Sequence, residues 1–307
     1  MNTGAHEQPA LDDMPTRLYS AAPSRLTTYL DCPRRYRMNY LERPTPQKGP
    51  PWGHNSVGAA VHSALANWWN LPVEKRTPEA GGALLVSGWP SDARRDGFRN
   101  DKQTLDARER ARGQVERYLE GVDPEDEPIG VERTVSVKTP RAALWGRVDR
   151  IDDRPGEGIV VVDYKTGRSV LTVDDARTSL ALAIYAAAAS RTFHRACHRV
   201  ELHHLPSGRV AVWEHTEESL TRHIRRADSI AAEVASLDDR YKAGMSQEEA
   251  DEAFPANIGP LCGWCDFNRV CEVGRAAVPA REPWAGVVTD GTTATGDRQE
   301  RYLRPRP

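Results

Sequence analysis

The 307-residue sequence lacks the marks of membrane-spanning, secreted and ATP-driven proteins. No apolar run approaches the roughly 20 residues that a transmembrane helix needs. Residues 1–15 are polar and acidic, without the basic start and apolar centre of a secretory signal. The sequence also lacks the Gly-x-x-x-x-Gly-Lys-Ser/Thr phosphate loop of nucleotide-driven motors. These absences predict a soluble, cytoplasmic protein with no membrane partner and no motor of its own.

Cysteine is scarce, and neither sign of charge dominates. The five cysteines are an odd number, which argues against a disulfide framework in a chain without a secretory signal. Three of them fall within ten residues, which points to metal binding instead. The formal net charge of −2 excludes a polycation, so any nucleic acid must be bound through local basic patches.

The pattern of apolar residues predicts one mixed α/β domain with helices around a central sheet. Helices are expected at about 24–40, 56–70, 104–120, 174–190 and 216–242, and strands at about 132–137, 142–151, 159–162, 199–205 and 209–215. Residues 71–102 look irregular. The domain is expected over 21–275, between a flexible leader at 1–20 and a disordered tail at 276–307.

Two aspartates stand on neighbouring predicted strands. Asp149 follows Gly-Arg-Val, and Asp163 ends the apolar run Val160–Val162. The turn between the strands is short, so they should pair antiparallel and bring the two carboxylates together. A carboxylate at the end of a buried valine run needs a compensating charge, and a divalent cation supplies one. The backbone carbonyl of Tyr164 is a further candidate oxygen ligand.

Lys165 lies two residues after Asp163, so on a strand both side chains face the same side. An ammonium group there can orient an attacking water and stabilise charge on a phosphate. A surface ion pair between the two is the simpler alternative for an isolated Asp-x-Lys. The second aspartate, the preceding valines and the following Thr166-Gly167 favour phosphodiester hydrolysis with Mg²⁺ or Mn²⁺.

The segments GRVDRID (146–152) and VVDYKTG (161–167) resemble the nuclease motifs of the RecB-like branch of the PD-(D/E)xK superfamily. The stretches 24–41 and 58–65 are similar to the cysteine helix and the histidine motif of the same branch. The resemblance implies that His62 is a metal ligand beside Asp149 and Asp163. Glu132 is a further candidate acid.

The resemblance also implies a DNA-contacting Gln-x-x-x-Tyr helix, which this sequence matches only in part. Tyr185 stands at the tyrosine position, but Ala181 replaces the glutamine. Core packing is the alternative role for Tyr185.

The spacing Cys262-x-x-Cys265-x5-Cys271 is that of a compact thiolate set. The resemblance implies that Cys32 is the fourth ligand of a [4Fe–4S] cluster, which would join the two ends of the domain. A structural zinc ion held by the same four cysteines is the alternative. Trp264 and Phe267 are expected to shield the group from solvent, and Cys197 is left as a spare thiol.

Two groups of arginines are candidates for contacting DNA. Arg34 and Arg35 lie near Cys32 among tyrosines, a combination that suits single-stranded DNA, although a solvated helix face is an equal alternative. Arg222, Arg225 and Arg226 form a second patch on the long helix expected at 216–242.

These features together favour an exonuclease that acts on DNA ends, with single-stranded DNA as the expected substrate. Its setting is expected to be DNA repair, recombination or CRISPR-associated processing, with a helicase or another protein of those pathways as partner. A non-catalytic module that binds DNA ends and a structure-specific endonuclease are the alternatives.

Overall fold

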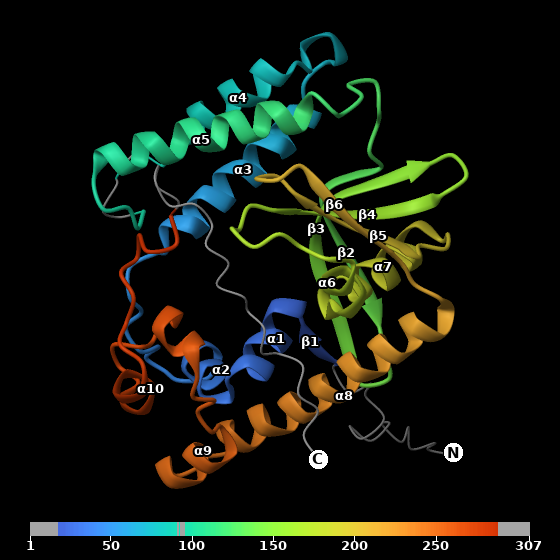
Figure 1. Ribbon diagram of the computed structural model, residues 1–307. Helices are drawn as coiled ribbons and strands as arrows, with labels where there is room; N and C mark the ends of the chain where they lie inside the picture. The colour runs from blue at the N-terminus through green and yellow to red at the C-terminus, as the bar shows by residue number, and fades with distance from the viewer. Residues whose placement is uncertain (1–17, 91, 93–95, 288–307) are drawn as a thin grey trace, which may run out of the picture.

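The computed structural model describes residues 18–90, 92 and 96–287. It contains a six-stranded mixed sheet with helices on both faces, as the sequence predicts (Figure 1). The strands are β1 (Tyr19–Ala21), β2 (Gly130–Lys138), β3 (Ala142–Arg154), β4 (Gly158–Lys165), β5 (Arg199–His204) and β6 (Arg209–Glu214). The helices are α1 (Pro23–Asp31), α2 (Pro33–Tyr40), α3 (Gly53–Trp69), α4 (Pro78–Ser87), α5 (Asp101–Leu119), α6 (Val173–Thr178), α7 (Leu180–Phe193), α8 (Glu217–Lys242), α9 (Gln247–Ala253) and α10 (Glu272–Ala277). Two 3₁₀ turns, η2 (Val73–Lys75) and η3 (Pro260–Trp264), complete the described elements.

The 13-residue strand β3 organises the sheet. β2 pairs with it antiparallel along one edge. β1 pairs in parallel with the beginning of β3, and β4 pairs antiparallel with its end. Leu144 pairs with both β1 and β2, and Arg150 pairs with both β2 and β4, so β1 and β4 share the edge opposite β2. β5 then adds in parallel to β4, and β6 adds antiparallel to β5.

The valines that end in Asp163 form the centre of the core. Val161 packs on the face covered by the alanine-rich helix α7. Val160 and Val162 pack on the opposite face, among residues of α3 and α5. A strand that is buried on both faces reads as a continuous apolar run, which explains the sequence. The hairpin from β3 to β4 turns through Gly156 and Gly158, whose positive φ angles of 81° and 77° suit glycine.

Several expected boundaries differ from the structure. The helix expected at 24–40 is interrupted at Cys32, because the following Pro33 begins a new helix. The helix expected at 174–190 is divided at Ser179, which caps α7. Residues 71–102, expected to be irregular, contain α4, and neither α9 nor β1 was predicted.

The expected ends of the domain are described only in part. Residues 1–17 of the predicted leader and 288–307 of the predicted tail lie outside the described residues. Tyr19 and Ser20, expected in the leader, belong to β1, and Val287, expected in the tail, is buried against Phe98 and Ala107. Among the described helices, none combines the length and apolar character needed to cross a membrane.

Candidate active site

A cleft opens where one edge of β3 has no neighbour. β1 ends its pairing at Leu144, and β4 begins its pairing at Arg150. Residues 145–149 between them have no strand on this edge among the described residues. A cavity of about 1420 Å³ lies here, and its lining comes from α3, α5, α7, the strands and the cysteine segment. The order of pairing along β3 therefore creates the cleft.

Asp149 and Asp163 stand where the β3–β4 hairpin separates. The last paired residues are Arg150 and Val162, and each aspartate is the next residue along its strand toward the cleft. Asp149 lines the cavity, and its Oδ2 accepts a hydrogen bond of 2.8 Å from the backbone N–H of Tyr164. Lys165 Nζ lies 2.5 Å from Asp163 Oδ2. The hairpin thus places both carboxylates and the lysine at the point where β3 and β4 diverge.

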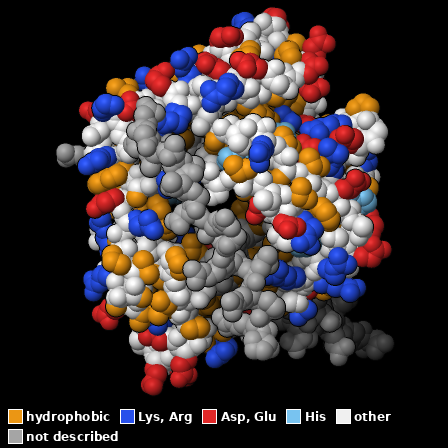
Figure 2. All heavy atoms as spheres, viewed as in Figure 1, with side chains coloured by type: hydrophobic (Ala, Val, Ile, Leu, Met, Phe, Trp, Pro, Cys, Tyr) orange, Lys and Arg blue, Asp and Glu red, His pale blue; other side chains and the backbone are white. Residues whose placement is uncertain are grey.

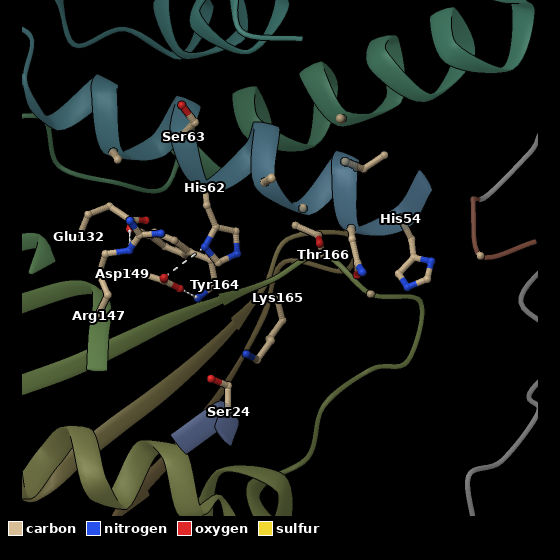
Figure 3. A pocket seen from close by; sticks show the side chains of 18 of the residues that line it. Ser24, His54, His62, Ser63, Glu132, Arg147, Asp149, Tyr164, Lys165 and Thr166 are labelled. Atoms are coloured by element: carbon tan, nitrogen blue, oxygen red, sulfur yellow. Dashed lines mark hydrogen bonds and ion pairs between the residues drawn. The ribbon is translucent and has the colours of Figure 1, made fainter. Parts of the chain in front are cut away.

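His62 and Glu132 meet Asp149 from two further elements (Figure 3). His62, on α3, directs Nδ1 to Asp149 Oδ1 at 3.1 Å. One ligand atom from each of His62, Glu132 and Asp149 lies within 4.8 Å of the others, a spacing that can hold a metal ion. Two carboxylates and an imidazole suit Mn²⁺ or Mg²⁺ when water and phosphate oxygens complete the coordination. The donor set therefore fits a divalent ion.

In β2 and β3, the regular alternation of side chains between the two faces of the sheet is interrupted at Glu132 and Asp149. On β2, Val135 packs under α7, whereas Val131, an even number of residues away, packs on the opposite face. Glu132 lies between them with a φ angle of +47°, a left-handed conformation that non-glycine residues seldom adopt. A non-glycine residue is retained in this conformation when its surroundings require it, and such residues concentrate at functional sites.

Burial and the neighbouring charge of Asp149 raise the pKa of two carboxyl groups at the site. Burial, and secondly the charge of Asp149, raise the pKa of Glu132. Burial also raises the pKa of Asp163, because Lys165 only partly offsets it and Asp149 adds to it. For His62, burial alone would lower the pKa, but the hydrogen bond and charge of Asp149 outweigh it and raise it. An added cation in the site would therefore favour the ionised forms of Glu132 and Asp163.

Tyr185 lines the same cleft from α7 and lies against the unpaired stretch of β3. A Cβ atom at Gly146 would stand 2.3 Å from Tyr185 Cε1, so only glycine admits the ring there. Burial, followed by the charges of Asp163 and Asp149, raises the pKa of the Tyr185 hydroxyl to about 12. The expected DNA-contacting tyrosine thus stands beside the acidic residues, and Ala181 leaves the glutamine position of its helix without a polar group.

Tyr164 and Lys165 leave β4 in different directions. The Tyr164 side chain is buried among α3 and α5, and only the backbone of this residue is available to the cleft as a ligand. Lys165, which is about half exposed, extends toward Ser24 at the start of α1 (Figure 3). Its ammonium group therefore lies on the open side of the cleft, where a substrate can reach it.

The four cysteines expected to bind a metal group line one small cavity. Cys32 lies between α1 and α2, Cys262 in η3, Cys265 directly after it, and Cys271 at the start of α10. The cavity has a volume of about 40 Å³. A Cβ atom at Gly274 would lie 3.3 Å from Cys271 Sγ and 3.6 Å from Cys262 Sγ, so this glycine leaves room beside the sulfurs. Among the described cysteines, no three sulfurs lie within 4.8 Å of one another.

The two aromatic residues of the cysteine loop separate. Phe267 is buried and lines the cysteine cavity, as expected. Trp264 instead lines the catalytic cleft, so its expected shielding role is corrected. Its ring lies 5.3 Å from that of Trp52 and under the guanidinium of Arg281, at 4.9 Å. The cysteine loop thus supplies an aromatic wall to the active site.

Arg34 and Arg35 are placed away from the catalytic residues. Both line the cysteine cavity, and neither lines the catalytic cleft. Arg34 pairs with Asp251 at 3.0 Å, and Arg35 lies 4.0 Å from Asp266. Their described partners are carboxylates of the C-terminal segment, so a DNA contact by these arginines stays a prediction.

Comparison with known proteins gives a family and two distant structural likenesses. The crystal structure of SSO0001 has 12% sequence identity and a TM-score of 0.36, with coverage of 85% of this chain and 89% of that one. A candidate exonuclease from Eubacterium rectale has 11% identity and a TM-score of 0.42, with coverage of 91% and 96%. No curated protein matches the sequence. Residues 20–272 match the family model of the PD-(D/E)XK nuclease superfamily, and the chain therefore belongs to that superfamily.

Proposed function

We propose that the protein is a divalent-metal-dependent exonuclease that hydrolyses phosphodiester bonds at DNA ends, with single-stranded DNA as its substrate. The observation that carries the proposal is the meeting of His62, Glu132 and Asp149 within 4.8 Å in an open cleft, beside Asp163 and Lys165. Membership of the nuclease superfamily supports the same chemistry.

Each group of the cleft has a task in this reaction. Glu132, Asp149 and His62 would hold Mg²⁺ or Mn²⁺, with Asp163 and the carbonyl of Tyr164 completing the protein ligands. The ion supplies Lewis acidity toward the phosphate and lowers the pKa of a water. Lys165, on the open side, orients the attacking water and stabilises the negative charge that develops on the phosphate. Tyr185 and Trp264 offer ring faces on which bases of a strand can stack.

The test is cleavage of linear single-stranded DNA by the purified protein with Mg²⁺ or Mn²⁺. Asp163→Ala and Lys165→Ala should abolish cleavage, and Asp153→Asn, which changes an exposed carboxylate outside the cleft, should not. Full activity in both cleft variants would refute the assignment. Resistance of a circular single strand would support an exonuclease, and its degradation an endonuclease.

A non-catalytic module that binds DNA ends is the second candidate, and the absence of the expected glutamine at Ala181 favours it. This candidate predicts binding of the same DNA without turnover in either metal. Because the sequence contains no phosphate loop, we also expect unwinding to come from a helicase or another partner in repair, recombination or CRISPR-associated processing.

We further propose that Cys32, Cys262, Cys265 and Cys271 hold a [4Fe–4S] cluster. Their arrangement around one cavity supports a shared group. A structural zinc ion held by the same four thiolates, with Zn–S bonds of about 2.3 Å, is the alternative. Anaerobically purified protein should be brown, and Cys262→Ser should remove the colour while Cys197→Ser, in the buried core, keeps it. Colourless protein that contains zinc would refute the cluster.

A further inference from the structure

A second hollow lies between α6, β6 and the first turns of α8, and it shares no lining residue with the catalytic cleft. Its volume is about 370 Å³, within the range of about 300–1,000 Å³ that small ligands occupy in proteins. Figure 2 shows Lys and Arg side chains gathered over this part of the surface, on the lower right of the view. The hollow is therefore large enough for a nucleotide-sized ligand.

The lining is strongly basic. Arg177 comes from α6, and Arg222, His223 and Arg226 come from α8. The lining contains no aspartate or glutamate among the described residues. Arg177 pairs with the exposed Asp174 at 3.0 Å, whereas no described carboxylate lies within 4.0 Å of Arg222 or Arg226. These two guanidinium groups are thus available to an anion from outside the chain.

The pKa of His223 reflects the positive charge of the arginines around it. Burial lowers the pKa of His223, and the charges of Arg226 and Arg222 lower it further. A neutral imidazole at neutral pH can donate one hydrogen bond and accept another. The hollow thus combines fixed charge from arginine with uncharged hydrogen-bonding groups from His223 and Thr216.

An aromatic ring borders the basic residues. Trp213 lies on β6, and the Arg177 guanidinium stands 5.9 Å from the centre of its ring. The indole N–H is directed to His215 Nδ1 at 3.3 Å, which fixes the edge of the ring against the buried His215. A ring held at its edge beside two unpaired arginines offers a stacking surface next to a phosphate site.

The hollow is linked to the catalytic cleft through one segment of chain. Arg168 and Ser169 line the cleft, and Arg177 on the same segment lines the hollow. Arg177 follows Ser169 by eight positions, so these two lining residues lie at most about 30 Å apart. The hollow therefore comes within that distance of the edge of the cleft.

We propose that this hollow is a second nucleic-acid subsite, in which Arg222 and Arg226 bind a backbone phosphate of a single strand and Trp213 stacks on a neighbouring base. The inference rests on the proposed nuclease function for the identity of the strand. Arginine suits the role because its planar guanidinium donates two hydrogen bonds to a phosphate. The subsite would anchor the strand outside the cleft, so that it matters for long substrates and not for short ones.

The test measures binding of labelled single-stranded DNA to the full chain by fluorescence anisotropy, with chelator present so that no hydrolysis occurs. Strands of about 4 and about 16 nucleotides are compared. The double variant Arg222→Gln, Arg226→Gln should bind the long strand about tenfold more weakly and the short strand unchanged. Its salt dependence, the slope of log K against log salt, should fall by about 0.7, the contribution of the one phosphate that the two arginines share.

The matched control is the double variant Arg240→Gln, Lys242→Gln, which removes the same charge from the last turn of the same helix, outside the hollow. Equal binding of the long strand by both double variants would overturn the subsite, and an acidic protein would then be the ligand to examine. A further variant, Trp213→Leu, should show a weaker preference for a base-bearing strand over an abasic one; an unchanged preference would overturn the stacking contact.

The outcomes separate this inference from the proposed function. Cleavage of the short strand with Mn²⁺ tests the nuclease alone, and the Arg222→Gln, Arg226→Gln variant should retain it. A protein that cleaves but binds the long strand independently of these arginines is a nuclease without the subsite. If the unmodified protein never cleaves DNA, but the Arg222→Gln, Arg226→Gln variant binds the long strand more weakly, the subsite is supported and the nuclease function is not.

Discussion

Two groups of carboxylates share the same sheet and differ in how their charge is balanced. At the cleft, Glu132 pairs with Arg147, Asp163 with Lys165, and Asp149 with the imidazole of His62. Farther along β3 and on β5, the two carboxylates of Asp152 and Glu201 are met by three arginines at 2.8–3.0 Å, namely Arg150, Arg154 and Arg199. We call this second group the arginine network.

The direction in which each carboxyl pKa is shifted agrees with this difference in charge compensation. Burial alone would raise the pKa of Glu201, but hydrogen bonds from His203, Arg154 and Arg199 outweigh it and hold the pKa far below its usual range. In the cleft, burial and like charge raise the pKa of Glu132 and Asp163. The arginine network is complete within the chain, whereas the cleft gains most from an added cation. The two groups of carboxylates therefore differ in how far the chain itself compensates their charge.

The largest expected effect is on catalysis. Asp163→Asn should lower the rate of DNA cleavage by about 10³-fold, because the amide weakens metal binding and the positioning of Lys165. The free energy of unfolding should not fall, since the substitution removes a buried carboxylate whose pKa is raised. Cleavage kinetics and urea denaturation of the same preparation check both parts. If Asp163→Asn lost stability and kept its activity, Asp163 would act like the carboxylates of the arginine network, and the account would be contradicted.

The corresponding change in the arginine network should act on stability. Glu201→Gln should lower the free energy of unfolding by about 3 kcal/mol at pH 7, since Arg154 and Arg199, both partly buried, lose the most deeply buried of their counter-charges. This figure allows for the partial exposure of Arg154, whose side chain is 30% exposed. Cleavage per folded molecule should stay unchanged, and urea denaturation beside cleavage assays measures the two.

The pH dependence of the same variant follows from the depressed pKa. A group of this kind stabilises the fold above its ordinary value of 4.5, and the contribution is lost as the pH falls through that value toward the folded-state pKa. The stability difference between the protein and Glu201→Gln should therefore be largest at neutral pH and shrink below about pH 4.5. A difference that grew on acidification would contradict the network.

The hairpin that carries Asp149 and Asp163 could be predicted from the sequence, but the elements that surround it could not. The apolar run before Asp163 and the short turn after Asp153 predict the antiparallel pairing of β3 and β4, because local pattern and turn chemistry determine it. The gap at 145–149 depends on β1, a three-residue strand whose pairing with β3 is a long-range contact. Three residues carry no periodicity, so no local signal marks that strand.

Local sequence patterns also do not predict where Glu132 and Trp264 lie. The sequence raises Glu132 only as a candidate acid, and its left-handed conformation is set by tertiary contacts around an interrupted strand alternation. Trp264 reaches the cleft because the C-terminal segment returns to the beginning of α3, where Gly53 N donates to Pro283 O at 3.0 Å. Its distance in sequence from the catalytic residues gives no indication of this closure.

A divalent ion should stabilise the cleft and leave the arginine network unaffected. At about 100 times its dissociation constant, Mn²⁺ should raise the free energy of unfolding by about 2.7 kcal/mol through binding to the folded state alone. His62→Ala should remove most of this gain. Thermal denaturation with and without Mn²⁺ measures it, and Glu201→Gln, although less stable, should show the full increase. Equal gains in all three proteins would place the ion elsewhere.

The smallest expected effect concerns the backbone at Glu132. Glu132→Gly and Glu132→Ala should both lose stabilisation by Mn²⁺, because each removes the carboxylate. In the absence of metal, the glycine variant should be more stable than the alanine variant by about 1 kcal/mol, since glycine adopts a φ angle of +47° without steric cost. Denaturation of the pair under chelation tests this, and equal stabilities would show that the left-handed conformation carries no cost.

The central claim is that the cleft carboxylates, and not the arginine network, bind the catalytic ion. Anomalous diffraction from crystals of the Lys165→Ala variant soaked in Mn²⁺ tests it most directly. The account predicts a manganese peak bounded by His62, Glu132 and Asp149, within reach of Asp163. A cleft without manganese, or a peak beside Asp152 and Glu201, would contradict it.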